Sequence, residues 1–174
     1  DIRRIAVVGH SRLGKTALWC GAMDERFSMV AANDSGGGGA AIFRGKTGEL
    51  VKDLAGTGSK LWFCGNFYRY AGRESEMPFD QHFVLALVAP RNLYISSASQ
   101  DDWADPKSEF LACAAASPVY ELLGYRGLVS PDRYPEENEC FHEGKIGYHL
   151  RKGTHYMGRY DWHKIMEYRQ KHNV

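Results

Sequence analysis

The sequence predicts an α/β fold in which a parallel sheet is flanked by helices. Four short runs of apolar and β-branched residues, at 5–8, 27–32, 91–97 and 146–150, are separated by segments with helical or irregular patterns. Continuous apolar runs of this kind are typical of parallel strands that are covered on both faces. The chain has 174 residues, 44% of them hydrophobic, which is enough apolar material for a core.

Composition excludes two classes of partner. The 22 basic and 21 acidic residues are interspersed and give a formal net charge of +1, so we expect no binding to nucleic acid. No apolar run approaches the roughly 18 residues of a membrane span, and these residues contain no signal peptide. We therefore expect no membrane partner.

Residues 5–19 contain the motif around which the rest of the chain is organised. An apolar strand ends at Gly9, Ser11 lies on a sharp turn, and a helix is expected over residues 12–23. Small residues around such a turn let the backbone kink, so that a serine hydroxyl is held above the sheet at a helix N-terminus. The spacing is one residue longer than the usual Gly-x-Ser-x-Gly, because Leu13 stands where the second glycine is expected. The pattern predicts a nucleophilic serine.

A phosphate-binding loop is the alternative interpretation of the same residues. Residues 9–16 also satisfy Gly-x(4)-Gly-Lys-Thr, which in nucleotide hydrolases links a strand to a helix. Asp34 and Asp101 follow predicted strands and could serve either function. His155, which follows the last strand, is required for serine hydrolysis but not for phosphate binding. The sequence thus favours an α/β-hydrolase, with a P-loop nucleotide hydrolase as the alternative.

The segments after the first helix follow in order. The strand at 27–32 ends in an acidic turn and a four-glycine run, 36–39, which we interpret as a tight bend beside a pocket. Residues 40–78 have weak periodicity and many aromatics, and we expect a long excursion that builds the pocket rather than a core element. The pattern of residues 78–90 indicates a short buried helix. The later elements are a strand at 91–97, a loop at 100–106, a helix at 106–123, an irregular segment at 124–144, a strand at 146–150 and a closing helix at 160–171.

The α/β-hydrolase interpretation also implies that the chain is a part of a larger unit. In that fold the serine turn follows the fifth of eight strands, and an early loop supplies one donor of the oxyanion hole. We expect residues 1–174 to be the C-terminal part of a catalytic domain, with 40–78 and 124–144 as pocket or surface loops. Its N-terminal strands are then absent, and the missing half of the domain is a required partner. This fragment alone is expected to be inactive.

The four cysteines are widely spaced and form no Cys-x-x-Cys pair, which makes a zinc site improbable. We interpret them as buried free thiols and leave open one disulfide through Cys140.

Six motifs occur in the order found in one known family. They are Gly-His-Ser-Arg-Leu-Gly-Lys at 9–15, Asn-Asp-Ser-Gly-Gly-Gly-Gly at 33–39, Trp-Phe-Cys-Gly-Asn-Phe at 62–67, Asp-Gln-His at 80–82, Asp-Asp-Trp-Ala-Asp-Pro at 101–106, and Gly-Tyr-His with Gly-Thr-His at 147–155. Together they resemble the bacterial type of glucuronoyl esterase, carbohydrate esterase family 15. The resemblance implies cleavage of the ester between lignin alcohols and the 4-O-methyl-glucuronic acid of xylan, without metal or cofactor. It also implies that the parent protein is secreted or periplasmic.

The resemblance assigns chemical roles to residues around the serine. Ser11 matches the nucleophile that forms an acyl-enzyme, His155 the base, and Arg12 a residue that stabilises the oxyanion. Among the other histidines, His82 lies in an apolar segment and is interpreted as a core histidine.

The resemblance also implies a sugar-binding set. Lys15 matches a lysine that binds sugar hydroxyls, Trp103 a tryptophan of the sugar pocket, and Glu49 a sugar-binding glutamate. The other three tryptophans, Trp19, Trp62 and Trp162, are interpreted as core residues.

The acid that orients His155 has two candidates. Asp34 occupies the position where the family usually has glutamate, so its side chain is one methylene shorter. Asp101 follows the next strand, where most α/β-hydrolases keep the acid. We favour Asp101, with Asp34 as a second carboxylate that supports the imidazolium or binds the glycine-rich loop, and with Asp102 pointing away.

Overall fold

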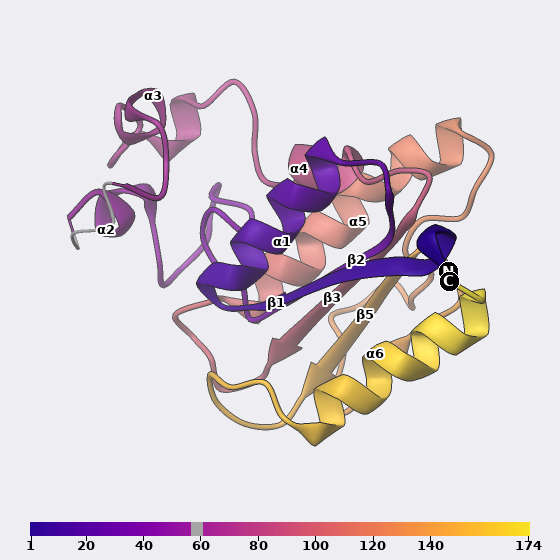
Figure 1. The fold of residues 1–174 in the computed structure, drawn as a ribbon. Coiled ribbons are helices and arrows are strands. Elements are labelled where there is room, and N and C mark those ends of the chain that lie inside the picture. Colours follow the sequence, from indigo (N-terminus) through magenta and orange to yellow (C-terminus); the bar gives the residue numbers. More distant parts are fainter. Residues whose placement is uncertain (57–60) are drawn as a thin grey trace.

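The computed structural model describes residues 1–56 and 61–174, which form one five-stranded sheet with helices on both faces (Figure 1). The strand order is β1-β2-β3-β5-β4. The strands are β1 (Ile5–His10), β2 (Phe27–Asn33), β3 (Asn92–Ala98), β5 (Ile146–Arg151) and β4 (Cys140–Phe141). The first four in this order pair in parallel, and β4 is antiparallel to β5. The predicted parallel sheet flanked by helices is confirmed.

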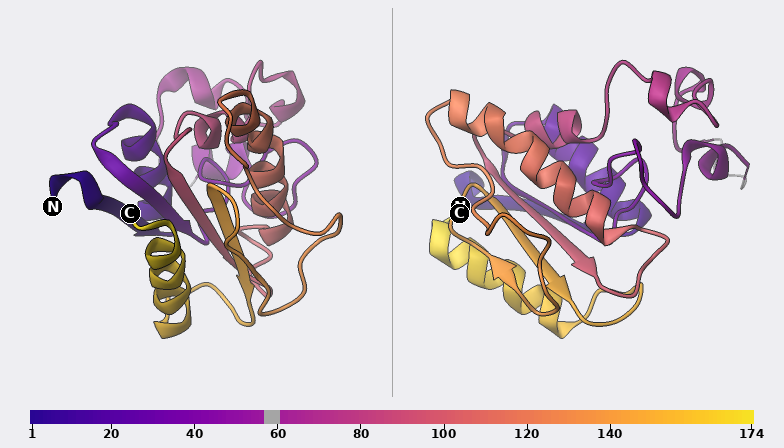
Figure 2. Two further views of the ribbon diagram at one scale, coloured as in Figure 1. Left: turned by 90° about the vertical axis from the view of Figure 1, so that its right-hand side faces the viewer. Right: turned by 180° about the vertical axis from the view of Figure 1, so that it is seen from behind.

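Four helices form two layers around the sheet. The helices α1 (Arg12–Met23), α4 (His82–Ala86) and α5 (Pro106–Leu122) cover one face, and α6 (Arg159–His172) covers the other (Figure 2). The short helices are η1 (Ile2–Arg4), α2 (Val51–Gly56), α3 (Gly65–Tyr68) and η2 (Glu74–Glu76). Of the helices in the described residues, none has the length and apolar character needed to cross a bilayer.

Side chains that point alternately to the two faces of the strands divide the core into two clusters, one under each layer of helices. In β3, Leu93 and Ile95 pack into the cluster beneath α1, α4 and α5, whereas Tyr94 between them packs into the cluster beneath α6. Successive side chains of a strand point to opposite faces, so a strand buried on both sides serves both clusters. The two ends of the chain lie side by side (Figure 2), where Arg169 Nη2 donates to the carbonyl of Arg4 at 2.7 Å.

The strand β1 is less buried than the sequence predicted. Its residues from Ile5 to Val8 are half-buried or exposed, and Ile5 is 42% exposed. The reason is its place at the edge of the described sheet, where β2 is its only paired strand.

The segment over residues 40–78 has a core of its own, which the sequence analysis did not expect. Five side chains are buried together there: Phe43, Val51, Leu54, Phe67 and Met77. Figure 1 shows α2 and α3 standing to one side of the sheet and its helices. The segment is therefore a small packed unit, and its residues 57–60 lie outside the described part.

The helix predicted over residues 78–90 is wrong in length and burial. Only α4 is helical, and Phe83 and Leu87 are 53% and 56% exposed. The preceding residues are held in a loop because the Asp80 carboxylate accepts the N–H groups of Phe43 and Arg44 at 2.7 and 3.1 Å. His82 is half-buried and packs on the ring of Phe83, so it is not a core histidine.

The core interpretation of three tryptophans is also wrong, because Trp19, Trp62 and Trp162 are 59%, 46% and 47% exposed. The cysteines are free, as preferred, but only Cys113 is buried and Cys64 is exposed.

Close packing of α1 on β2 generates a stability prediction. A Cβ atom placed on Gly21 would lie 2.2 Å from Val30 Cγ2, and Val30 is fully buried. We expect Gly21→Ala to lower the free energy of unfolding by about 1–3 kcal/mol through overpacking, although alanine is the better helix former. Urea unfolding measures the change.

The matched control is Gly65→Ala in α3, where a Cβ atom added to the glycine would meet no heavy atom within 4 Å. It should change the free energy of unfolding by less than about 0.5 kcal/mol. Equal stability of Gly21→Ala and the unsubstituted protein would contradict the packing argument.

Candidate active site

Ser11 is held in a strained turn between β1 and α1. Its backbone has φ 58° and ψ −128°, a conformation that L-residues rarely adopt. The turn is tight enough that a Cβ on Gly9 would lie 2.0 Å from the carbonyl oxygen of Leu13. Gly14 packs against Ser35, and Leu13, the extra residue of the motif, is 64% exposed. Two glycines therefore make the close contacts, and the inserted leucine is directed outward.

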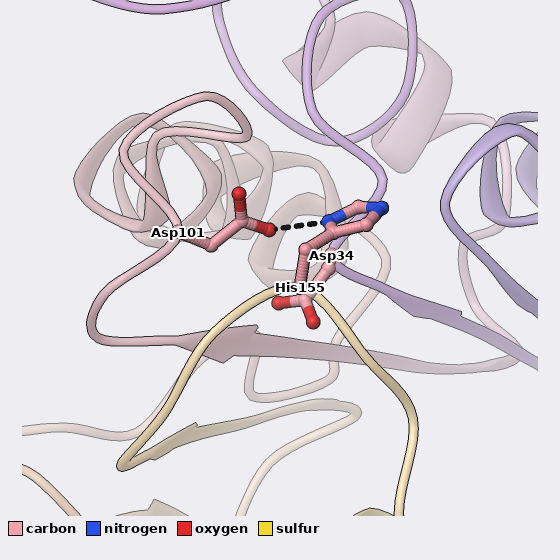
Figure 3. Close-up of side chains that lie close together, drawn as sticks. All are labelled: Asp34, Asp101 and His155. Carbon is pink, nitrogen blue, oxygen red and sulfur yellow. Dashed lines mark hydrogen bonds and ion pairs between the residues drawn. The ribbon is translucent and has the colours of Figure 1, made fainter.

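Three side chains form a chain of hydrogen bonds across the carboxyl ends of the strands. The distance from Ser11 Oγ to His155 Nε2 is 2.8 Å. The distance from His155 Nδ1 to Asp101 Oδ2 is 2.6 Å, and Figure 3 shows this second contact. Asp101 is 5% exposed, and its Oδ1 accepts the N–H of Ala104 at 3.2 Å. With its proton on Nδ1, the imidazole can accept the serine proton while it donates to the carboxylate.

Asp34 lies close to this chain but is bound elsewhere. Its Oδ1 accepts the N–H of Ala98 at 2.7 Å, and its Oδ2 accepts Arg151 Nη2 at 3.1 Å. Burial, followed by the negative charge of Glu109, raises the pKa of Asp34 to about 9 against the opposing effect of Arg151. The oxygen and nitrogen atoms of Asp34, Asp101 and His155 that could bind a metal ion lie within 4.8 Å of one another (Figure 3). Because Asp34 is bound to Ala98 and Arg151, it is Asp101, and not Asp34, that lies on the imidazole Nδ1.

The glycine-rich loop is anchored by Glu109, a residue that the sequence analysis missed. The carboxylate of Glu109 is fully buried in α5 and accepts the N–H groups of Ser35 and Gly36 at 2.8 and 2.9 Å. It also accepts the hydroxyls of Ser35 and Ser97 at 3.0 and 2.6 Å. Burial raises the pKa of Glu109. The expectation that Asp34 binds this loop is therefore wrong, because Glu109 binds it instead. The sequence signal for Glu109 was a single acidic residue on the apolar face of the predicted helix.

A cavity of about 310 Å³ opens beside Ser11 and His155. Its lining includes the predicted residues Arg12, Lys15, Glu49 and Trp103, together with Trp62, which was expected in the core. Trp62 and Trp103 are 46% and 53% exposed. The Arg12 guanidinium carbon lies 5.5 Å from the centroid of the Trp62 ring. One wall of the cavity is thus aromatic.

Lys15 also lines the cavity, and three hydrogen bonds fix the position of its ammonium group. Its Nζ donates to the carbonyls of Ser35 and Gly37 at 2.7 and 2.6 Å and to Glu49 Oε2 at 2.6 Å. The side chains of Lys15 and Glu49 are 10% and 14% exposed. Asp102, by contrast, is exposed and does not line the cavity.

The start of α1 argues against the phosphate-binding interpretation. The helix begins at Arg12, directly after Ser11, so residues 9–16 form no extended loop that could wrap a phosphate.

Comparison with known proteins identifies relatives over nearly the whole chain. The family model "Glucuronyl esterase, fungi" matches residues 1–124. A carbohydrate esterase from an unknown prokaryotic organism is 46% identical over 99% of this chain and 39% of its own length. A 4-O-methyl-glucuronoyl methylesterase from Wolfiporia cocos is 36% identical over 72% of this chain and 33% of its own.

Solved structures agree with these relatives. A glucuronoyl esterase from Solibacter usitatus superposes with a TM-score of 0.89 at 46% identity, over 98% of this chain and 42% of that protein. A CE15 glucuronoyl esterase from Teredinibacter turnerae superposes with a TM-score of 0.91 at 37% identity. The superposition covers 100% of this chain and 42% of that protein. The chain spans about two-fifths of the length of these proteins.

Proposed function

Because the chain belongs to the glucuronoyl esterases of carbohydrate esterase family 15, we propose that its protein is a serine esterase acting on glucuronoxylan. The bond cleaved is the ester between 4-O-methyl-glucuronic acid of xylan and lignin alcohols. The observation that carries the proposal is the hydrogen-bonded chain from Ser11 through His155 to Asp101 beside a cavity. One related esterase was solved in complex with methyl 4-O-methyl-β-D-glucopyranuronate, which has the same ester linkage. Since the polymer lies outside cells, the proposal implies a secreted or periplasmic protein.

The proposed reaction proceeds through an acyl-enzyme. His155 Nε2 removes the proton from Ser11 Oγ as the oxygen attacks the ester carbonyl, and the imidazolium then protonates the leaving alcohol. Water, deprotonated by the same imidazole, attacks the acyl-enzyme, and the imidazolium returns the proton to Ser11 Oγ as the uronic acid is released. Asp101 accepts a hydrogen bond from Nδ1–H throughout, which holds the ring in the required tautomer and stabilises its charged form.

Arg12 is the proposed stabiliser of the oxyanion. It is the first residue of α1, and the first N–H groups of a helix have no acceptor within that helix. Its guanidinium lines the same cavity and can add a charge-assisted hydrogen bond. Donors of this kind contribute about 3–4 kcal/mol of transition-state stabilisation. An alkyl uronate ester is neutral, so its binding beside Arg12 and Lys15 needs no compensating charge.

The sugar is proposed to bind between the polar and the aromatic walls. Lys15 and Glu49 are held in one geometry by their ion pair, which leaves them preorganised to bind ring hydroxyls. Trp103 offers an exposed indole face to the apolar side of the ring. Asp34 is proposed as a second carboxyl group that supports the imidazolium, since it lies near His155 while Asp101 is bound to Nδ1. Because burial raises the pKa of Asp34 to about 9, it does so at pH 7 as a neutral, polar group.

The direct test of the proposal is Ser11→Ala in the protein expressed with any natural flanking sequence. Loss of the nucleophile should lower kcat on methyl glucuronate by at least about 10⁴-fold, with the fold retained by circular dichroism. Ser99→Ala, which removes a hydroxyl bound to Glu137, is the control and should leave kcat unchanged. Turnover by Ser11→Ala close to that of the control would overturn the proposed function.

The two carboxylates are separated by Asp101→Asn and Asp34→Asn. An amide at 101 can donate to Nδ1 and so favours the wrong tautomer, and kcat should fall by about 10⁴-fold. The same change at 34 removes no hydrogen bond to the imidazole and should cost about 10-fold. Steady-state kinetics measure both, with the exposed Asp102→Asn as the control. The reverse order of losses would mean that Asp34 is the working acid.

Sugar recognition is tested by Lys15→Met, which keeps most of the apolar stem of the side chain. A hydroxyl contact made in both ground and transition states is uniform binding, so KM for glucuronate esters should rise about 10-fold and kcat should change less. Lys52→Met, on the exposed surface of α2, is the matched control. An equal loss on simple acetate esters, which lack the sugar, would show that Lys15 does not recognise it.

A further inference from the structure

Arg151, the last residue of β5, is buried directly behind the proposed active site. It is only 2% exposed, although arginine is almost never fully buried unless it is paired. Its Nε donates to both carboxylate oxygens of Asp161 at 3.0 and 3.1 Å, and its Nη2 donates to Asp34 Oδ2 at 3.1 Å. One guanidinium therefore joins the ends of β5 and β2 to the first turn of α6.

The same guanidinium also binds the carbonyl groups of the two residues on either side of His155. Nη2 donates to the carbonyl of Thr154 at 2.8 Å and to the carbonyl of Tyr156. The ring of Tyr156 stacks on it, with 3.9 Å from the guanidinium carbon to the ring centroid. Because both neighbouring carbonyls turn toward Arg151, His155 between them is directed to the other side of the loop, where Ser11 lies.

A second route links Arg151 to the imidazole ring through Asp161. The Oδ1 of Asp161 also accepts Asn33 Nδ2 at 3.3 Å, and Asn33 Oδ1 lies 2.7 Å from His10 Nδ1. The ring of His10 packs on the ring of His155 with 4.7 Å between centroids. Arg151 thus restrains His155 in two ways. It binds the backbone beside His155 directly, and it orders the residues that pack on the imidazole ring.

We infer that Arg151 is a positioning residue, whose guanidinium sets the conformation of the loop at 152–157 and so aligns His155 with Ser11 and Asp101. The inference rests on the proposed role of His155 as the base. Arg151 has no hydrogen bond to Ser11 and does not itself line the cavity, although it donates to Asp34, which does. Its effect on the reaction is therefore transmitted through the residues that it binds.

The shape of the guanidinium, and not its charge alone, is required for this role. Arginine presents five N–H donors in a planar fork, whereas lysine has three donors on one nitrogen. Arg151→Lys keeps the positive charge beside Asp34 and Asp161 but cannot bind both carboxylates and both loop carbonyls together. The other charged or titratable groups that face His155 or line its cavity are unchanged: Asp101, His10, Arg12, Lys15 and Glu49.

The test compares Arg151→Lys with the unsubstituted protein, expressed with any natural flanking sequence. A misplacement of about 1 Å can cost about 100-fold in rate, so kcat on methyl glucuronate should fall by about 10- to 100-fold. KM should change by less than about 3-fold, because the sugar contacts are intact. The low-field proton NMR signal of His155 Nδ1–H, hydrogen bonded to Asp101, should broaden or disappear.

The matched control is Arg133→Lys, which alters an arginine bound by both terminal nitrogens to the carboxylate of Glu139, away from the cavity. It should leave kcat and the His155 signal unchanged. Loss of kcat and of the signal only in Arg151→Lys, at a temperature at which both variants are folded, is the result expected from positioning.

Two outcomes would overturn the inference. If Arg151→Lys folds and retains both kcat and the His155 signal, the guanidinium does not align the histidine. If kcat falls only in proportion to the folded fraction, measured by circular dichroism, the role of Arg151 is structural. Neither outcome affects the proposed function, which fails separately if Ser11→Ala remains active.

Discussion

The shared register of four parallel strands is the constraint on which the candidate site depends. His10, Asn33, Ser96 and His149 are paired across the sheet, one from each of β1, β2, β3 and β5. Parallel strands present their carboxyl ends at one edge, so the residues that follow each strand meet there. Ser11 follows the first of these positions by one residue and Asp34 follows the second by one. A slip in any one pairing would move a site residue away from its partners.

Buried charge holds that edge in one geometry. Glu109 fixes the glycine-rich loop, and Arg151 joins Asp34 and Asp161 to the histidine loop, all at or near zero exposure. Each charge taken out of water costs several kcal/mol, which is offset only when its donors and acceptors are all matched. Such networks are weak sources of net stability. Their value here is that they allow one arrangement of the loops around Ser11 and penalise others.

The cavity has a different origin, since its walls come from segments that pack outside the sheet. The unit over residues 40–78 has its own apolar cluster and presents Glu49 and Trp62 to the cavity. The loop after β3 presents Trp103 and Asp101, so one short connection serves both the histidine and the pocket wall. The chemistry and the recognition surface are therefore supported by separate packing units that meet at Lys15 and Glu49.

Local pattern alone determined the order of the four parallel strands and of the helices α1, α5 and α6, the turn at Ser11 and the position of His155 after the last strand, because these depend on neighbouring residues and on chain order. Only the tertiary structure decided between Asp101 and Asp34, since both follow strands and the choice depends on which carboxylate faces Nδ1. The same holds for Trp62, which is exposed on the cavity wall, and for Glu109 and Arg151, whose partners lie 74 and 117 residues away in the chain. Hydrophobicity along the sequence cannot report such contacts, because burial of a side chain is set by what the rest of the fold places over it.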